Sequence, residues 1–470
     1  MPPRPRAAVL PLVVVFAAGY LAAYLLPTIV GRLGSSPGGL GLSATHAGAV
    51  GSALLLSSAT AGLTLASRVD CAGPVRLARA GLLLMVAGFA LAAATAHVPL
   101  VVAGCVIGGF GSGTATAVAA VGIAARPDPH RASVLGLLTT SATAGALYLV
   151  LPRLGGGHAL PFAAIACAAA LVLPAAGRLP SAPDRTGSPR RGAPGRLPHR
   201  RSGTVLAGAM LCWSMAQNAL WGVSGRIGLD RAGLSEAALG LVFAVALGGG
   251  LAGVSAAGAL GSRLGRAIPV GVGTAVIACC VAVSASAGGA VPFAAGEVLW
   301  NTVYPVVLSY VIGLAASLDG QGRWAVLAGS ASNVGVACGP LAGTLLSTHV
   351  GYPVMGAVLA CALLATAVPL TAVALHSGGR VLLPGAIRRR GGAAAAAVAG
   401  AAGAPAGAVP ELGGTELVVT AIEVGPPPGD ATAPVHDPLP EPAPGPEPLP
   451  QPEPLSEPVL HGEQAALVTA

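Results

Sequence analysis

Glu297 is the one acidic residue inside the long apolar stretches of this sequence. Asn301 and Tyr304 follow it at four and seven residues, so the three side chains fall on one face of a helix. Trp300 flanks this face, and Pro305 follows it. A carboxyl group in an apolar segment is costly and is therefore a candidate for function, here the binding of a proton or a cationic group. The alternative is a hydrated acid near an interface, where it is tolerated without a role.

Two other apolar stretches carry polar and aromatic residues at helical spacing. One has an aromatic and amide stripe at i, i+4 and i+8 with a second amide alongside: Trp213, Gln217, Trp221 and Asn218. The other, near the N-terminus, has Tyr20 and Tyr24. Such side chains can bind a small organic solute, although aromatic residues also gather at membrane interfaces.

The sequence offers little for metal, cofactor or covalent chemistry. None of the eight cysteines falls into a metal-ligand spacing, and the nine histidines are dispersed. A phosphate-binding loop of the Gly-x-x-x-x-Gly-Lys type is excluded because the sequence has no lysine. The acidic residues of the loops form no paired set. We therefore expect no metal, no cofactor and no enzyme, and energy must come from ion or solute gradients.

Composition indicates that lipid is the main solvent of these segments. The chain is 54% hydrophobic and 9% charged, whereas soluble proteins carry roughly 25% charged residues. Apolar runs of about 20 residues, long enough to cross a bilayer, recur near 8–30, 47–67, 80–97, 99–124, 133–152, 159–177, 204–224, 238–260, 268–287, 291–315, 324–346 and 352–376. The prediction is an all-α polytopic membrane protein with twelve transmembrane helices.

The arginines predict the orientation of these helices. With a cytoplasmic N-terminus, 21 of the 25 basic residues fall on the inner side, as the positive-inside rule requires. We expect both termini in the cytoplasm and the protein in the cell inner (plasma) membrane. The net charge of +8 does not indicate nucleic-acid binding, because the arginines lie between apolar stretches and not along one face.

The longest inner connection divides the helices six and six. We expect an N-terminal six-helix bundle at 1–177, a basic Pro/Gly/Arg-rich cytoplasmic linker at 178–203 and a C-terminal six-helix bundle at 204–377. The segment 378–470 is Ala/Gly-rich and then Pro/Glu-rich, a composition that cannot bury a core. It is expected to be a disordered cytoplasmic tail.

The two halves repeat at an offset of 192 residues, as in transporter folds whose binding site lies between repeats. The loop ASRVDCAGPVR, from residue 66, carries Asp70, Gly73 and Arg76. Its counterpart, GALGSRLGR, carries Gly258, Arg263, Gly265 and Arg266. Both copies resemble the Gly-x-x-x-Asp-Arg-x-Gly-x-Arg motif of the major facilitator superfamily, with Ala66, Cys71 and Ser262 as departures. The sequence is similar to this superfamily over roughly residues 8–376.

The resemblance implies a central cavity lined by helices 1, 4, 7 and 10. The expected solute-binding residues are Tyr20, Tyr24, Trp213, Gln217, Asn218, Trp221, Trp300, Asn301 and Tyr304, with Glu297 as the proton-coupling group. The two loop motifs would form a latch that holds the inner gate shut: Asp70, Gly73, Arg76, Gly258, Arg263, Gly265 and Arg266. The alternative is that these arginines only anchor the loops in the cytoplasm.

The function expected on this basis is secondary transport of a small organic solute, by proton-coupled efflux. LPTIV at 26–30 is similar to sugar- and drug-efflux branches. Helix 5 lacks their Gly-Pro-x-x-Gly signature, which appears instead at 339–343, and Gly104 or Cys105 replaces the usual arginine of helix 4. Symport, uniport and a transport-inactive sensor or scaffold therefore stay open. The expected partners are a neutral or cationic solute, protons and the lipid bilayer, and we expect a monomer.

Overall fold

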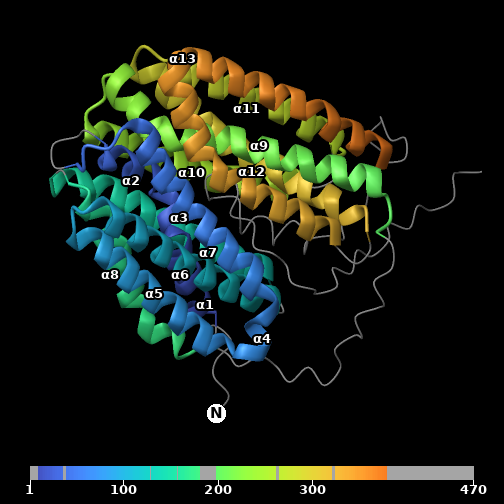
Figure 1. The fold of residues 1–470 in the computed structure, drawn as a ribbon. Helices are drawn as coiled ribbons and strands as arrows, with labels where there is room; N and C mark the ends of the chain where they lie inside the picture. The colour runs from blue at the N-terminus through green and yellow to red at the C-terminus, as the bar shows by residue number, and fades with distance from the viewer. Residues whose placement is uncertain are drawn as a thin grey trace, which may run out of the picture. The chain divides into compact units, whose positions relative to one another are not determined.

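Every regular element in the described part of the chain is a helix. The computed structural model describes residues 9–34, 39–126, 129–155, 157–179, 197–260, 264–319 and 323–377, all within one compact unit of the chain. The predicted tail and most of the predicted linker lie outside these residues. Figure 1 shows the helices in chain order, from blue through green to orange.

The first half consists of α1 (Leu10–Tyr24), α2 (Leu26–Leu33), α3 (Ala44–Leu65), η1 (Ala66–Arg68), α4 (Val69–Ala72), α5 (Pro74–Ala94), α6 (Val98–Ala124), α7 (Pro129–Val150), η2 (Leu151–Arg153) and α8 (Ala159–Ala176). Local sequence explains several boundaries. Pro27 at the start of α2 accompanies a 40° bend between α1 and α2. The hydroxyl group of Ser43 caps α3 by accepting from the His46 amide.

The second half consists of α9 (Arg200–Arg226), the π-helical turn η3 (Ile227–Arg231), α10 (Glu236–Leu260), α11 (Ala267–Ser286), α12 (Ala290–Ser317) and α13 (Arg323–Ser377). α13 is not one continuous helix, because Gly351 has φ 77° and ψ 164° and breaks it. The sequence LSTHVGYPV around this break places Pro353 just after the glycine, as expected for a helix end.

The predicted internal repeat is visible in the helix boundaries. α10 begins at Glu236, 192 residues after Ala44 of α3, and α12 begins at Ala290, 192 residues after Val98 of α6. The two predicted loop motifs also share a turn, since Gly73 (φ 87°) and Gly265 (φ 64°) stand 192 residues apart. Positive φ favours glycine at both positions.

Among the residues that the structure describes, nine helices are long and apolar enough to cross a membrane, or ten if α1 and α2 count as one span. This result supports a polytopic membrane protein, but the predicted twelve helices are not confirmed. α13 counts once in spite of its break at Gly351. α9 is not among the spans, because the amides Gln217 and Asn218 lower its hydropathy.

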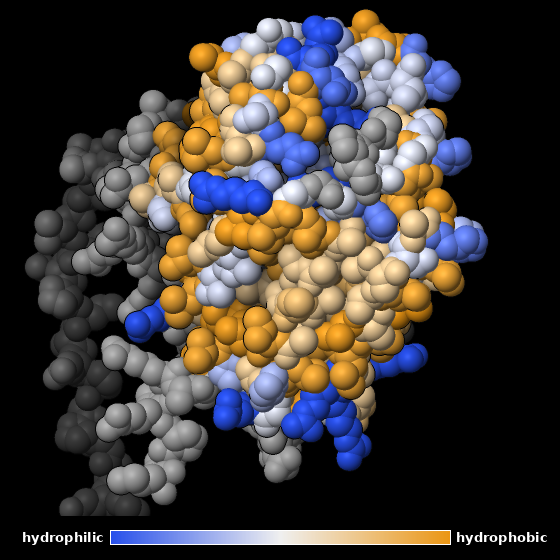
Figure 2. Space-filling view, turned by 90° about the vertical axis from the view of Figure 1, so that its left-hand side faces the viewer, coloured by the Kyte–Doolittle hydropathy of each residue, from blue (hydrophilic) through white to orange (hydrophobic). Residues whose placement is uncertain are grey.

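The exposed surface of the helices is apolar, as lipid contact requires. Leu171 is 81%, Val291 80% and Val368 70% exposed. Figure 2 shows apolar residues over the middle of one face and hydrophilic residues toward its two ends. Inside, small residues let helices approach closely: a Cβ atom on Gly104 of α6 would lie 2.9 Å from the Ala92 amide of α5.

Candidate functional site

Glu297 lies in α12 and is fully buried. Its Oε1 atom accepts a hydrogen bond of 2.8 Å from the hydroxyl group of Ser224 on α9. Its Oε2 atom has no hydrogen-bond partner among the described residues. A buried polar atom without a partner is uncommon and costly, and a carboxylate in such a place is more so. The structure thus places the acid in the protein interior, and not at a hydrated interface.

Ser224 can satisfy Glu297 in either protonation state. Its hydroxyl oxygen lies 2.8 Å from Oε1 of Glu297 and 3.1 Å from the carbonyl oxygen of Leu220, and it has one proton to donate. With Glu297 ionised, Ser224 can donate to the carboxylate. With Glu297 protonated, the carboxyl group can donate to Ser224 while Ser224 donates to Leu220. The pair is therefore suited to exchange of a proton.

Aromatic and amide side chains bridge α9 and α12 next to this pair. The indole N–H of Trp300 donates to the side-chain oxygen of Gln217 at 2.8 Å. The rings of Trp300 and Trp221 meet edge to face with centroids 5.9 Å apart. The rings of Trp213 and Tyr304 stack at 5.3 Å. Such geometries stabilise aromatic pairs beyond the burial of their area.

The residues predicted to bind solute lie in one interior region, since Tyr24 of α1 is within electrostatic range of Tyr20 and of Tyr304 on α12. Seven of them come from α9 and α12, the two helices that the Ser224–Glu297 hydrogen bond joins: Trp213, Gln217, Asn218, Trp221, Trp300, Asn301 and Tyr304. Six of them are almost fully buried, and Asn301 is half-buried, with its amide donating to the Glu297 carbonyl. Tyr20 packs on Phe16 of its own helix at 4.6 Å. These side chains are packed against one another, and not spread along an open wall.

Tyr24 and Trp221 belong to a layer where the two halves meet. The Trp221 indole N–H lies 3.4 Å from the carbonyl oxygen of Ala23 on α1. The Tyr148 hydroxyl of α7 donates to the carbonyl oxygen of Tyr24 at 2.5 Å. The Tyr148 ring lies 5.0 Å from that of Phe243 on α10. The packed aromatic residues of α9 and α12 are thus continuous with the contact between the two halves.

An ion pair joins the halves at the end of the bundle where α2 ends and α10 begins. Nη2 of Arg32 lies 2.6 Å from Oε2 of Glu236, and Nη1 donates to the carbonyl oxygen of Gly155 at 2.7 Å. The Arg32 side chain is 7% exposed and that of Glu236 is 43% exposed. We call this contact the Arg32–Glu236 pair.

The Gly-Pro-x-x-Gly run at 339–343 lies where α13 crosses α3 and α9. A Cβ atom on Gly48 of α3 would meet the side chain of Thr344 and lie 2.8 Å from the Pro340 carbonyl oxygen. One on Gly222 of α9 would lie 2.8 Å from the Pro340 Cα atom. The Leu341 amide donates to the Ser52 hydroxyl at 3.0 Å, since a proline disturbs the helix hydrogen bonds beside it. This run is a close contact between the halves.

The predicted inner latch is only partly described. Arg76 is exposed in the first turn of α5, and Gly258 is exposed near the end of α10. Arg266 donates to the Ser317 hydroxyl at 2.6 Å, which ties the start of α11 to the end of α12. Burial lowers the pKa of Arg266 from its ordinary value. The Asp70 side chain and Arg263 lie outside the described residues, so the latch stays a prediction.

Comparison with known proteins gives the family. A family model described as Major Facilitator Superfamily matches residues 9–318. The chain belongs to this superfamily. The resemblance predicted from the two loop motifs is thereby confirmed, and proteins of this superfamily are transporters. No curated protein matches the sequence.

Solved structures share the superfamily fold at low sequence identity. The human organic anion transporter MFSD10 (TETRAN) is 18% identical, with a TM-score of 0.57 over 79% of this chain and 100% of that chain. A D-xylose-proton symporter is 14% identical, with a TM-score of 0.63 over 80% and 99%. A POT family transporter in complex with a thioalcohol conjugated peptide is 14% identical, with a TM-score of 0.59 over 77% and 94%. At these identities the likeness shows the fold alone.

Four residues of the central layer or of the contact between the halves were missed from sequence. Ser224 had a signal, since it stands seven residues after Gln217 and continues the polar face of α9. Tyr148 had no such signal in the sequence, because a single tyrosine in an apolar helix is an ordinary core residue. From sequence, Arg32 is one of the four arginines on the outer side, and Glu236 is one of the loop acids that form no paired set. Their pairing needs the three-dimensional contact between segments 204 residues apart.

Proposed function

We propose that this superfamily member is a proton-coupled secondary transporter that exports a small organic solute, and that Glu297 binds and releases the coupled proton. The observation that carries the proposal is the buried Glu297 carboxyl group, with one oxygen on Ser224 and the other without a partner among the described residues. An intramembrane carboxyl group of this kind is costly to retain unless it has a function.

The surroundings of Glu297 favour a neutral or cationic solute with aromatic or apolar parts. Aromatic faces attract cations and pack on apolar groups. The solute-binding residues that we propose are Tyr20, Tyr24, Trp213, Gln217, Asn218, Trp221, Trp300, Asn301 and Tyr304. Because these side chains are packed together here, solute binding requires them to separate. The Trp300–Gln217 hydrogen bond between α9 and α12 is a contact that a polar solute could replace.

We propose that contacts at the two ends of the bundle control alternating access. The Arg32–Glu236 pair and the contact of Gly48 with Pro340 join the halves toward the end where α2 ends. We propose that the predicted units 1–177 and 204–377 separate there in the other state. The loop motifs, with Asp70, Gly73 and Arg76 in one copy and Gly258, Arg263, Gly265 and Arg266 in the other, then close the opposite end. This end is the cytoplasmic one in the predicted orientation, with both termini and the linker 178–203 on that side.

The test uses inverted membrane vesicles with an acidified lumen and a dye that reports the pH gradient. Lipophilic cations, sugars and antibiotics are added in turn to vesicles with wild type, Glu297→Gln or the matched acid-to-amide control Asp230→Asn. Asp230 is exposed in η3. We expect at least one solute to dissipate the gradient with wild type and Asp230→Asn, and not with Glu297→Gln.

Each outcome separates the remaining possibilities. If Glu297→Gln dissipates the gradient as wild type does, Glu297 is not the coupling group. If no solute acts, the export proposal loses its main support, and uptake into right-side-out vesicles distinguishes symport and uniport from a transport-inactive sensor. Symport would show proton-dependent uptake, and uniport would show uptake without a proton gradient.

A further inference from the structure

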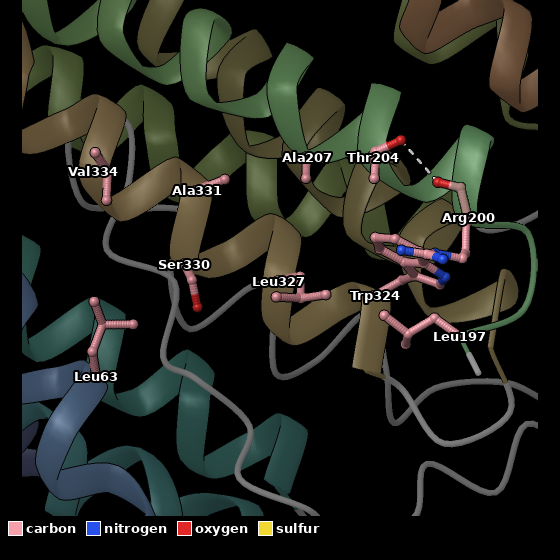
Figure 3. A pocket seen from close by; sticks show the side chains of 10 residues that line it. All are labelled: Leu63, Leu197, Arg200, Thr204, Ala207, Trp324, Leu327, Ser330, Ala331 and Val334. Atoms are coloured by element: carbon pink, nitrogen blue, oxygen red, sulfur yellow. Dashed lines mark hydrogen bonds between the residues drawn. The ribbon is translucent and has the colours of Figure 1, made fainter. Parts of the chain in front are cut away.

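A groove of about 470 Å³ opens at the end of the bundle where α9 and α13 begin and α3 ends. Figure 3 shows its lining, with Arg200 and Thr204 from α9, Leu327, Ser330 and Val334 from α13, and Leu63 from α3. It is separate from the Glu297 site, since Glu297, Ser224 and the aromatic residues of α9 and α12 described above do not line it. Its volume is within the range of about 300–1,000 Å³ that is typical of ligand sites.

The walls of the groove present apolar surface. Besides leucine, valine and alanine, they contain two hydroxyl groups, and both are already used within their own helices. The Thr204 hydroxyl donates to the Arg200 carbonyl at 2.8 Å, and the Ser330 hydroxyl donates to the Val326 carbonyl at 2.9 Å. An occupant of these walls is therefore mainly hydrocarbon.

The charge at the mouth of the groove is positive. Arg200 is exposed in the first turn of α9, where the helix dipole also favours a negative group. Within the part of the chain that the structure describes, no carboxylate forms an ion pair with Arg200. Arg201 is exposed beside it but does not line the groove.

Backbone contacts hold the mouth in place. The indole N–H of Trp324, a buried side chain that also lines the groove, donates to the Pro198 carbonyl at 2.7 Å. A Cβ atom on Gly203 would collide with the Trp324 ring, so α9 and α13 are in close contact here. The His199 ring lies 3.2 Å from the Leu318 carbonyl oxygen. The segment that presents Arg200 is thus fixed against the start of α13, and the groove is preformed.

Arg200 has no ion-pair partner among the described residues and lies beside an apolar groove at one end of the helices, and this combination matches one class of ligand. We propose that the groove binds an anionic phospholipid of the adjacent leaflet. Its phosphate contacts Arg200, and one acyl chain lies along Leu327 and Val334. A guanidinium group is well suited to phosphate, and basic pockets between transmembrane helices bind lipid headgroups in this way. This inference does not depend on proton coupling or on the direction of transport.

The experiment measures lipid binding to the delipidated full-length protein by native mass spectrometry. Phosphatidylglycerol and phosphatidylcholine with identical acyl chains are titrated separately, and inorganic phosphate is tested as a competitor. The proteins are wild type, Arg200→Gln, the matched control Arg201→Gln, and Ala331→Trp, which fills the groove. Size-exclusion chromatography confirms that each variant is folded, and solute transport in vesicles is followed in parallel.

We expect saturable binding of phosphatidylglycerol, with about tenfold weaker binding of phosphatidylcholine because the charge-assisted contact carries the preference. Arg200→Gln should lose this preference and Arg201→Gln should keep it. Ala331→Trp should weaken binding of both lipids, and millimolar phosphate should not compete. An unchanged preference in Arg200→Gln, binding undisturbed by Ala331→Trp, or absence of saturable binding would each overturn the proposal. Competition by inorganic phosphate would show a simple anion site in its place.

Discussion

At the scale of single residues, variants of Ser224 can distinguish a role in proton exchange from a role in packing. Its hydroxyl group can stabilise both forms of Glu297, so its loss should slow every step that changes the protonation of Glu297. Ser224→Ala should lower the rate of proton-coupled transport about ten- to hundredfold, since one hydrogen bond to a charged group contributes roughly 1.5–3 kcal/mol. Ser224→Thr keeps the hydroxyl group and should retain most of the rate.

The measurement is the initial rate of solute-dependent proton release from vesicles, with solute–solute exchange as the control. Exchange at constant pH needs no change in the protonation of Glu297, so it should be affected much less. Equal losses of both activities in Ser224→Ala would mean that the serine has only a structural role.

The limits of sequence reading are also clear at this scale. Glu297, Trp300 and Gln217 could be selected because charge, aromaticity and spacing are properties of one helix at a time. The hydrogen bond between Trp300 and Gln217 could not be predicted from the sequence, because it depends on how α12 is rotated against α9. The same holds for Oε2 of Glu297, whose lack of a partner among the described residues follows from neighbouring helices and not from its own sequence.

At the scale of helices, Gly48 is predicted to be essential to the contact of α3 with α13. An added methyl group would meet the Thr344 side chain and the Pro340 carbonyl oxygen, so something must shift. Gly48→Ala should lower stability by about 1–3 kcal/mol through overpacking. The matched control is Gly62→Ala on the same helix, where nothing lies within 4 Å. There the better helix propensity of alanine should leave stability equal or higher.

The measurement is the apparent Tm of the purified proteins in one detergent. A lower Tm for Gly48→Ala and an unchanged or higher Tm for Gly62→Ala are expected. Equal values for the two variants would contradict the close contact between α3 and α13.

The helices themselves were largely predictable, and their contacts were not. Apolar runs of about 20 residues located nearly every helix, because a transmembrane segment is specified by its own hydrophobicity. The glycine-proline run at 339–343 was recognised as a motif, but its role in joining α13 to α3 appears only when Ser52 and Leu341 are seen in contact. In α9, the amides Gln217 and Asn218 lower the hydropathy of the helix, and the structure shows that the Gln217 amide contacts Trp300 of α12.

At the scale of the whole transporter, the Arg32–Glu236 pair predicts an asymmetric response to removal of either charge. Glu236→Gln leaves the Arg32 guanidinium, which is 7% exposed, without its counter-charge. An uncompensated buried charge costs several kcal/mol, on the order of 3–5 in fully buried cases. Separation of the halves would let Arg32 reach water, so this variant should favour the state in which this end is open. Arg32→Gln leaves Glu236, which is 43% exposed and already hydrated, so its effect should be smaller, about 1 kcal/mol or less.

The distance between spin labels at Arg153 and Arg231 measures this equilibrium. Both positions are exposed, one in η2 of the first half and one in η3 of the second. In a background with the native cysteines replaced, Glu236→Gln should increase the long-distance population more than Arg32→Gln does. The double variant should return toward wild type, because it removes the buried charge together with its partner. If the two single variants shift the distances equally and their effects add, the pair does not control separation of the halves. The contacts between α3 and α13, with Gly48 against Pro340, would then be the ones that keep this end closed.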